Sequence, residues 1–223
     1  MEPRYARNIP ALTEEECRRL QTKRVLVVGC GGLGGHIIDQ LARIGIGFLR
    51  VVDGDVFESS NLNRQLLSWT SLLGVSKAKA AAEHVARVNP DVKVEAVETF
   101  MTRQKVRSLI ADCDIVMDAL DNIPSRRLLA SACEEEGIPY VYGAIQGWVA
   151  QAGISMPGDN LIGKLFPQEV EIRDKSVLSF TPAMCASMQT SLCVKHLVGR
   201  PVEAGTVYYF DLLNQEFETI PMV

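Results

Sequence analysis

A glycine-rich turn, Gly29-Cys-Gly31-Gly32-Leu-Gly34, follows a run of apolar residues and precedes a stretch with helical periodicity. The apolar run at 24–28 is expected to form a strand buried on both faces, and residues 32–44 a helix. Between a strand and a helix, missing β-carbons let the backbone approach a phosphate, and the helix N-terminus offers free N–H groups. The turn therefore predicts a nucleotide site, and a tight turn without a ligand is the alternative.

Strand and helix patterns continue to alternate along the chain. Further strands are expected at 48–52, 92–97, 115–118 and 140–142, and helices at 76–88, 103–111 and 125–136. Residues 148–155 are expected to pair antiparallel at an edge of the sheet. A helix at 183–198 and a hairpin of 206–212 with 215–220 are expected to follow. This order predicts an α/β, Rossmann-like fold with a mostly parallel sheet, helices on both faces and antiparallel C-terminal edge strands.

The sequence is expected to form a single domain over residues 1–223. A hydrophobic content of 47% is enough to bury a substantial core. An N-terminal helical arm is expected at 1–22, where Thr13 and Glu16 have the spacing of a capping box. A long polar segment at about 158–181 is expected as a crossover loop.

Composition excludes several classes of protein. A net charge of -4 argues against a nucleic-acid surface, which needs a clustered basic face. No apolar stretch reaches the 18 or so residues of a membrane span, and the N-terminus lacks the apolar segment of a signal peptide. The six cysteines have no paired spacing, which favours reduced, buried thiols. These features predict a cytoplasmic protein.

An acidic pair and an Asn/Arg-rich stretch follow the second expected strand. Asp53 ends this strand 22 residues beyond Gly31, where a carboxylate accepts hydrogen bonds from ribose hydroxyls. NAD and ATP share this ribose, so the residues further along must discriminate between them. The polar and charged residues after the second and fourth strands include Asn61, Arg64, Gln65, Lys77 and Asp121.

The carboxyl ends of parallel strands face one crevice, so these side chains are expected to converge. Arg64 and Lys77 would neutralise a triphosphate, and Asp121 would hold Mg²⁺ against its oxygens. A dinucleotide carries only a pyrophosphate and gains little from such a set. The residues therefore favour ATP.

Structural alternatives exist for each of these residues. Arg64 is placed to pair with Asp55 or Glu58 at the surface, and Asp121 to cap the helix that follows Pro124. A cation such as Lys77 at a helix start is disfavoured by the helix dipole, which favours a phosphate role for it. Asp55 and Asp118 remain open between supporting and binding roles.

Six motifs together resemble the MoeB/ThiF/HesA form of the ubiquitin-activating superfamily. They are Arg4-Tyr-Ala-Arg7-Asn, Gly29-Cys-Gly-Gly-Leu-Gly34, Asp53-Gly-Asp55, Ser60-Asn-Leu-Asn-Arg-Gln65, Gly74-Val-Ser-Lys77 and Asp118-Ala-Leu-Asp-Asn122. The resemblance covers nearly the whole chain. Each motif alone is weak, and the combination is specific.

The resemblance implies an adenylyltransferase that uses ATP and Mg²⁺. It implies nucleotide binding by Gly29, Gly31, Gly32, Gly34, Asp53, Asp55, Asn61, Arg64, Gln65, Lys77, Asp121 and Asn122. The implied catalytic residues are Arg64, Lys77, Asp121 (as the Mg²⁺ ligand), Asn61 and, from the neighbouring subunit of a homodimer, Arg7. The implied substrate is the C-terminal Gly-Gly carboxylate of a ThiS- or MoaD-like sulfur carrier.

The chain departs from the family pattern at its cysteines. Many members carry two Cys-x-x-Cys zinc pairs, and the first is expected near 161–164, where this chain has none. We therefore expect no zinc. The 158–181 segment also lacks the cysteine that takes the carrier in some relatives. Cys185 is then either a nucleophile or, as favoured, a packed core thiol, and a separate sulfur donor is expected.

Other functions remain open at this point. A second adenylation activity would act on a small-molecule or tRNA-linked carboxylate. An NAD(P)-dependent oxidoreductase would need a proton-transfer residue, and the three histidines, His36, His84 and His196, are all expected on helices. A non-catalytic subunit would usually lack the arginine and lysine present here.

Overall fold

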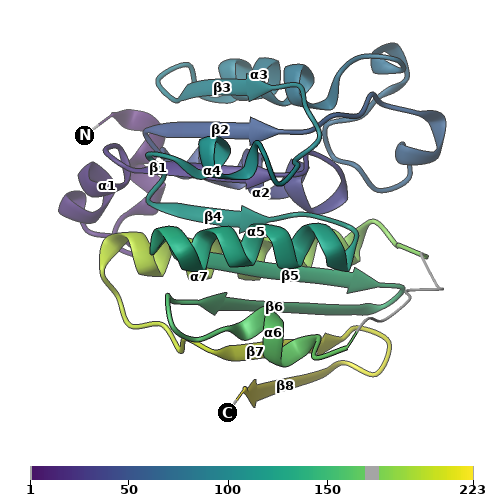
Figure 1. Cartoon of the computed structure of the whole chain (residues 1–223). Helices are drawn as coiled ribbons and strands as arrows, with labels where there is room; N and C mark the ends of the chain where they lie inside the picture. The colour runs from purple at the N-terminus through teal and green to yellow at the C-terminus, as the bar shows by residue number, and fades with distance from the viewer. Residues whose placement is uncertain (1, 169–175, 223) are drawn as a thin grey trace.

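One sheet of eight strands organises the chain, in the order β3-β2-β1-β4-β5-β6-β7-β8 (Figure 1). The computed structural model describes residues 2–168 and 176–222. The strands are β1 (Arg24–Val28), β2 (Phe48–Val52), β3 (Lys93–Val97), β4 (Ile115–Asp118), β5 (Tyr140–Gln146), β6 (Val149–Ser155), β7 (Thr206–Asp211) and β8 (Glu216–Pro221). The first five strands pair in parallel, and β6, β7 and β8 are added antiparallel to them. The predicted Rossmann-like sheet with antiparallel C-terminal strands is confirmed.

Helices cover both faces of this sheet. They are η1 (Pro3–Asn8), α1 (Glu14–Leu20), α2 (Gly32–Ile44), η2 (Ser59–Asn61), η3 (Thr70–Leu72), α3 (Lys77–Val88), α4 (Val106–Ile110), α5 (Ile123–Glu136), α6 (Leu161–Leu165) and α7 (Phe180–Val198). α2, α3 and α7 bury their apolar side chains in one core cluster, and α4, α5 and α6 contribute to a second cluster on the opposite face (Figure 1). Within residues 2–168 and 176–222, none of the helices combines the length and apolar content of a membrane span.

Several boundaries differ from the sequence-based expectation. α4 is shorter than 103–111, because Val106, Leu109 and Ile110 are its buried residues and the chain before them forms a turn. β5 extends beyond 140–142 to Gln146, since its antiparallel pairing with β6 continues to Val149. The expected crossover loop contains α6, and α7 begins at its end. Residues 169–175 of that loop lie outside the described ranges.

The N-terminal arm packs against the carboxyl ends of α2 and α3. Tyr5 is 2% exposed, and its hydroxyl accepts a hydrogen bond of 2.8 Å from Asn89 Nδ2. The predicted capping box of α1 is present: Glu16 N donates to Thr13 Oγ1 (3.1 Å), and Thr13 N donates to Glu16 Oε2 (2.7 Å). α1 is joined to the end of α7, where Arg19 Nη1 donates to the Val198 carbonyl (3.2 Å) and Arg200 Nε donates to Glu16 Oε1 (2.6 Å).

α2 approaches the end of β1 more closely than a side chain allows. A β-carbon placed on Gly34 would lie 1.8 Å from the Gly29 carbonyl oxygen. Gly29 has φ of +98°, a backbone conformation that favours glycine. These two positions bring the first turn of α2 onto the end of β1.

Gly34→Ala should therefore lower the free energy of unfolding by about 3 kcal/mol, because the new methyl group overlaps backbone that must shift. Urea denaturation provides the measurement. Gly32→Ala is the matched control in the same helix, since its β-carbon would meet no atom closer than 3.7 Å, Pro182 Cβ. Equal stability of the two variants would show that the close contact does not constrain the helix.

Candidate functional site

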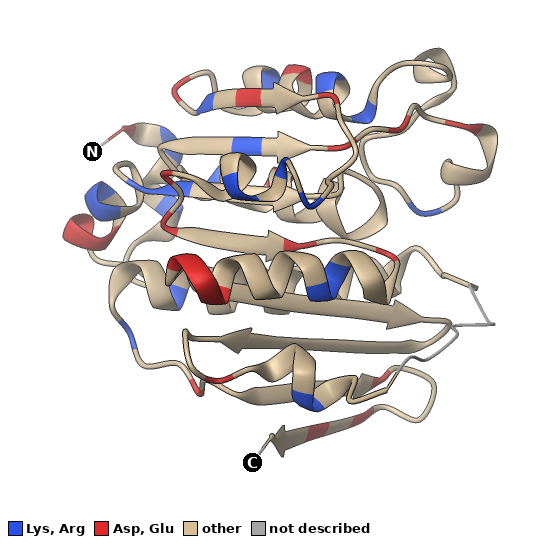
Figure 2. Cartoon of the chain, in the orientation of Figure 1, with Lys and Arg blue, Asp and Glu red and all other residues tan. Residues whose placement is uncertain are grey.

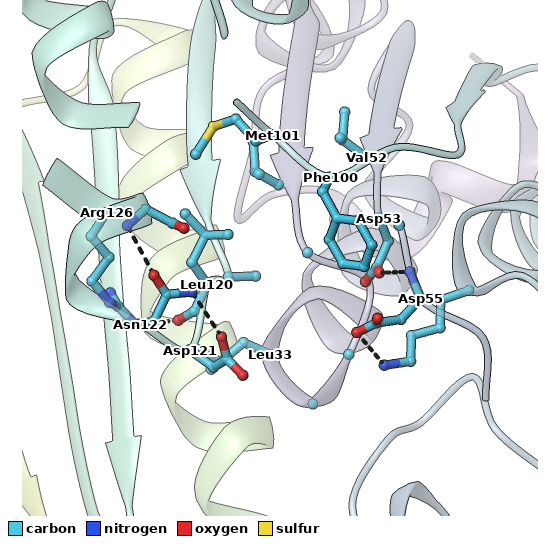
Figure 3. A pocket seen from close by; sticks show the side chains of 18 of the residues that line it. Leu33, Val52, Asp53, Asp55, Phe100, Met101, Leu120, Asp121, Asn122 and Arg126 are labelled. Carbon is cyan, nitrogen blue, oxygen red and sulfur yellow. Dashed lines mark hydrogen bonds and ion pairs between the residues drawn. The ribbon is translucent and has the colours of Figure 1, made fainter. Parts of the chain in front are cut away.

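A cavity of about 480 Å³ opens at the carboxyl ends of the parallel strands. Ten predicted site residues line it: Gly29, Gly31, Gly32, Asp53, Asp55, Arg64, Gln65, Lys77, Asp121 and Asn122. The predicted residues Gly34, Asn61 and Arg7 are not among the described lining. Figure 3 shows Asp53, Asp55 and Phe100 on one side of this cavity and Asp121, Asn122 and Arg126 on the other.

Asp53 is fixed at the end of β2 by two backbone donors. Its Oδ2 accepts from Cys30 N (2.7 Å), and its Oδ1 accepts from Asp55 N (2.8 Å). Burial raises the pKa of this carboxyl, and the two N–H groups and nearby Lys77 oppose that rise. Each carboxylate oxygen keeps a further lone pair, so Asp53 can still accept hydrogen bonds from ribose hydroxyls.

Lys77 brings a buried positive charge to the cavity wall. It is the first residue of α3, only 7% of it is exposed, and its Nζ lies 3.4 Å from Asp55 Oδ2. The N-terminus of α3 adds a partial positive charge that disfavours an ammonium there in the absence of an anion. A bound phosphate would stabilise both positive charges.

Gln65 has an unsatisfied polar atom in the cavity wall. Only 7% of the residue is exposed, and its Oε1 has no hydrogen-bond partner among the described residues. Buried polar atoms are normally paired, so this unpaired oxygen at the cavity is placed to accept a hydrogen bond from a ligand or a water molecule. Its terminal amide lies beside Gly31, at the start of α2.

Arg64 makes its described hydrogen bonds to neutral groups. Nη1 donates to the Ser60 carbonyl (2.8 Å) and to Asn63 Oδ1 (3.0 Å). In residues 2–168 and 176–222, Arg64 forms no ion pair with Asp55 or Glu58, the partners that the sequence offered as an alternative. No described carboxylate therefore neutralises the positive charge of its guanidinium, which can attract an anion at the cavity.

Asp121 does not cap α5, because the next residue does. Asn122 Oδ1 accepts from Ser125 N (2.9 Å), which is the N-cap bond of this helix. Asp121 Oδ1 accepts from Asn122 Nδ2 (3.2 Å), and the carboxylate is exposed at the cavity. The alternative role of Asp121 as the helix cap is thus taken by its neighbour.

This arrangement fits Mg²⁺ held jointly with phosphates. Mg²⁺ is commonly bound through one or two carboxylates plus substrate phosphates, with water completing its shell. Across the described part of the chain, no three His, Cys, Asp or Glu residues cluster as an all-protein metal site. Of the three aspartates in the described lining, Asp53 accepts backbone N–H groups and Asp55 pairs with Lys77, so Asp121 is the one most available to supply an oxygen ligand.

Two of the predicted residues outside the lining have structural contacts. Asn61 is 7% exposed, and its Oδ1 accepts from Glu58 N (3.0 Å), which closes the η2 turn beneath Arg64. Gly34 makes the close contact of α2 with β1 described above. Arg7 lies on the exposed surface of η1.

Several cavity residues were not expected from the sequence. Thr99, Phe100 and Met101 follow β3 and line the cavity, and Phe100 is 64% exposed there. Their position just after a strand was a usable signal, since strand ends share this edge. Arg126 also lines the cavity, from within α5. No sequence motif singled it out.

Cys185 is a packed core thiol. It is fully buried in α7, its Sγ donates to the Gln151 carbonyl at 3.2 Å, and burial raises its pKa to about 12. All six cysteines are free and buried. The three histidines lie on α2, α3 and α7, and none of them is in the described cavity lining.

Iodoacetamide at pH 8 should leave Cys185 unmodified in the native protein, because a thiol of this pKa is about one part in ten thousand thiolate at that pH. Peptide mass spectrometry before and after denaturation provides the measurement. Cys133 is the matched control, since burial also raises its pKa to about 12. Faster native labelling of Cys185 than of Cys133 would identify it as a reactive thiol.

Known proteins resemble this chain over almost its whole length. The ThiF family model matches residues 5–223. The SAMP-activating enzyme E1 of Haloferax volcanii is 39% identical, over 98% of this chain and 84% of that protein. The sulfur carrier protein adenylyltransferase of Thermus thermophilus is 32% identical, over 97% and 86%. The probable adenylyltransferase/sulfurtransferase MoeZ of Mycobacterium tuberculosis is 31% identical over 97% of this chain, which spans 59% of it.

Solved structures share the fold at lower identity. Escherichia coli MccB with MccA-N7isoASN superimposes with a TM-score of 0.88 and 19% identity, over all of this chain and 73% of that one. PaaA gives a TM-score of 0.78 at 24% identity, over 93% and 66%. The sequence matches carry the further conclusion: this chain belongs to the ThiF family, in its MoeB/ThiF branch.

Proposed function

We propose that this protein uses ATP to adenylate the C-terminal glycine carboxylate of a ubiquitin-like sulfur carrier, releasing pyrophosphate. The observation that carries the proposal is the cavity itself, which brings together the glycine turn, Lys77, Gln65 and Asp121 in its lining. The names of two relatives, each matched over more than four fifths of its own length, support the activity and the substrate class. Membership of the ThiF family disfavours the oxidoreductase alternative.

In the proposed reaction a carboxylate oxygen of the carrier attacks the α-phosphorus of ATP. The bond from that phosphorus to the oxygen bridging to the β-phosphate breaks, and pyrophosphate leaves with the electron pair. The carboxylate is ionised at neutral pH, so no general base is required. Catalysis is then alignment and charge stabilisation, for which Lys77, Arg64 and the N-terminus of α2 are placed.

Asp53 would hold the ribose, and Asp121 would hold Mg²⁺ with the phosphates. Bound Mg²⁺ would offset the charge of the triphosphate. In this proposal Asn61 helps to position Arg64 through the η2 turn, because Arg64 N donates to the Asn61 carbonyl (3.1 Å). Asp55 holds Lys77 beside the cavity through the 3.4 Å ion pair.

A homodimer is part of the proposal, because Arg7 lies far from the cavity of its own subunit. η1 packs near the carboxyl end of α2, whereas the cavity lies at the amino end of that helix. Thirteen helical residues separate the two ends, a rise of about 20 Å. Apolar side chains at Val56, Leu62, Leu66, Trp69 and Leu73 are exposed on the segment between β2 and α3. They offer a surface for the second copy.

The sulfur step would use a separate donor in the cytoplasm. All six cysteines of the sequence are buried, so none is placed to take the carrier from the adenylate. The proposed product is therefore the acyl-adenylate, which a sulfur donor consumes.

Replacing Arg64, Lys77 or Asp121 with alanine should slow carrier-dependent ATP–pyrophosphate exchange by at least about 100-fold, because each change removes transition-state stabilisation. Lys79→Ala is the matched control: this lysine also lies in the first turn of α3 but pairs with Glu98 at the surface (2.9 Å). Circular dichroism checks folding. Wild-type exchange in all three variants would refute the site, and exchange driven by a small carboxylate or tRNA would replace the substrate.

Mixing Arg7→Ala with Lys77→Ala protein should restore about one quarter of the wild-type rate, if subunits exchange at random in a two-fold symmetric dimer. The physical reason is that half of the dimers then carry one site with both residues intact. Exchange kinetics of the mixture and of each variant alone provide the measurement. No recovery, with mixed dimers demonstrated by mass spectrometry, would place Arg7 outside the partner's site.

A further inference from the structure

A buried ion pair lies beneath the segment that carries Asp121. Arg126 in α5 is 4% exposed and Asp118 at the end of β4 is fully buried. Their Nη1 and Oδ2 atoms are 2.7 Å apart. Burying two charges costs free energy that the pairing alone often fails to recover, so such a pair is weak evidence for stability. The role of the pair is indicated instead by the backbone groups to which the two side chains are hydrogen-bonded.

The pair holds the backbone on both sides of the β4–α5 turn. Arg126 Nη2 donates to the Leu120 carbonyl, and Nη1 donates to the Gly143 carbonyl of β5 at 2.6 Å. Asp118 Oδ1 accepts from Leu120 N at 2.8 Å. Both backbone polar groups of Leu120 are therefore bonded to the pair, and the next residue is Asp121.

Two further side chains fix Asp118 itself. The Tyr140 hydroxyl donates to Asp118 Oδ2, and Gln189 Nε2 donates to the Asp118 carbonyl at 2.8 Å. Tyr140 belongs to β5 and Gln189 to α7, so three elements converge on one residue. Figure 3 shows Arg126 beside Leu120, Asp121 and Asn122 at the cavity wall.

We propose that Arg126 is a positioning residue that, through Asp118 and Leu120, fixes the turn from which Asp121 meets a divalent metal and its nucleotide. The inference rests on the metal role given to Asp121 in the proposed function. The planar guanidinium supplies donors in a fixed fork to three acceptors on two strands and a turn. A lysine ammonium would keep the charge but not the fork.

Arg126→Lys should weaken Mn²⁺ binding to the complex with α,β-methylene-ATP about tenfold or more, as loss of partners that orient metal ligands does. Electron paramagnetic resonance of free Mn²⁺ measures it without turnover. In metal-free protein, amides 119–122 should also exchange faster with deuterium. Binding of the metal-free nucleotide should stay within about twofold, since Asp53 and Lys77 are untouched, while the KM for the metal–ATP complex rises by about the same factor as the lost metal affinity.

Arg50→Lys is the matched control. Arg50 Nε donates to Glu95 (2.8 Å), and its Nη1 donates to the carbonyls of Leu109 (2.7 Å) and Ala111 (2.9 Å), so it also joins one carboxylate to two carbonyls. It does not belong to the described cavity lining. The Arg50→Lys variant should lose about as much thermal stability as Arg126→Lys, and its Mn²⁺ affinity should equal that of the wild type.

Equal Mn²⁺ affinity in Arg126→Lys and wild type, or an equal loss in Arg50→Lys, would overturn the inference. If Arg126→Lys does not fold, Tyr140→Phe decides: removing one bond to Asp118 should weaken Mn²⁺ binding by at least about twofold, and an unchanged value counts against the inference. Asp121→Ala in the same assay separates the two proposals. Undiminished Mn²⁺ binding there refutes the metal role together with this inference, whereas ATP–pyrophosphate exchange tests adenylation independently.

Discussion

The contact between α2 and the end of β1 sets the geometry on which the site depends. Gly34 lies against the Gly29 carbonyl, and this approach holds the amino end of the helix at the edge where the parallel strands end. Gly31 and Gly32 then form part of the cavity wall. A helix displaced outward by one methyl group would carry its N–H groups away from that edge. The same contact therefore packs α2 against the core and places its N-terminus where an anion can bind.

Charge is distributed across the cavity in a way that suits a magnesium nucleotide. Lys77 and the amino ends of α2 and α3 provide positive potential, and Asp53 and Asp121 provide carboxylates on opposite sides (Figure 3). On the rest of the molecule, Figure 2 shows acidic and basic residues interspersed over the described elements. The uncommon features are buried: Lys77 at a helix start, and the Arg126–Asp118 pair under the turn. Both incur a desolvation cost, and both adjoin the cavity.

Much of this could be read from local pattern. The strand and helix order, the capping box at Thr13 and the convergence of Asp53, Lys77 and Asp121 all follow from residue periodicity and the rule that parallel strands share an edge. The role of Asp121 was harder to predict from the sequence, because an aspartate just before a helix is also a common helix cap. Only the hydrogen bond from Ser125 to Asn122 decides which of the two neighbours caps α5.

The sequence by itself determined the fold class, the family resemblance and the edge of the sheet where the polar residues gather, because these depend on local spacing and composition. Tertiary structure decided what long-range contacts control. It buried Cys185 among β5, β6 and α7, turned Asn61 into the support of a loop, and brought Arg126 to a turn and a second strand. Burial and hydrogen-bond partners arise from elements far apart in the chain, so no local motif encodes them.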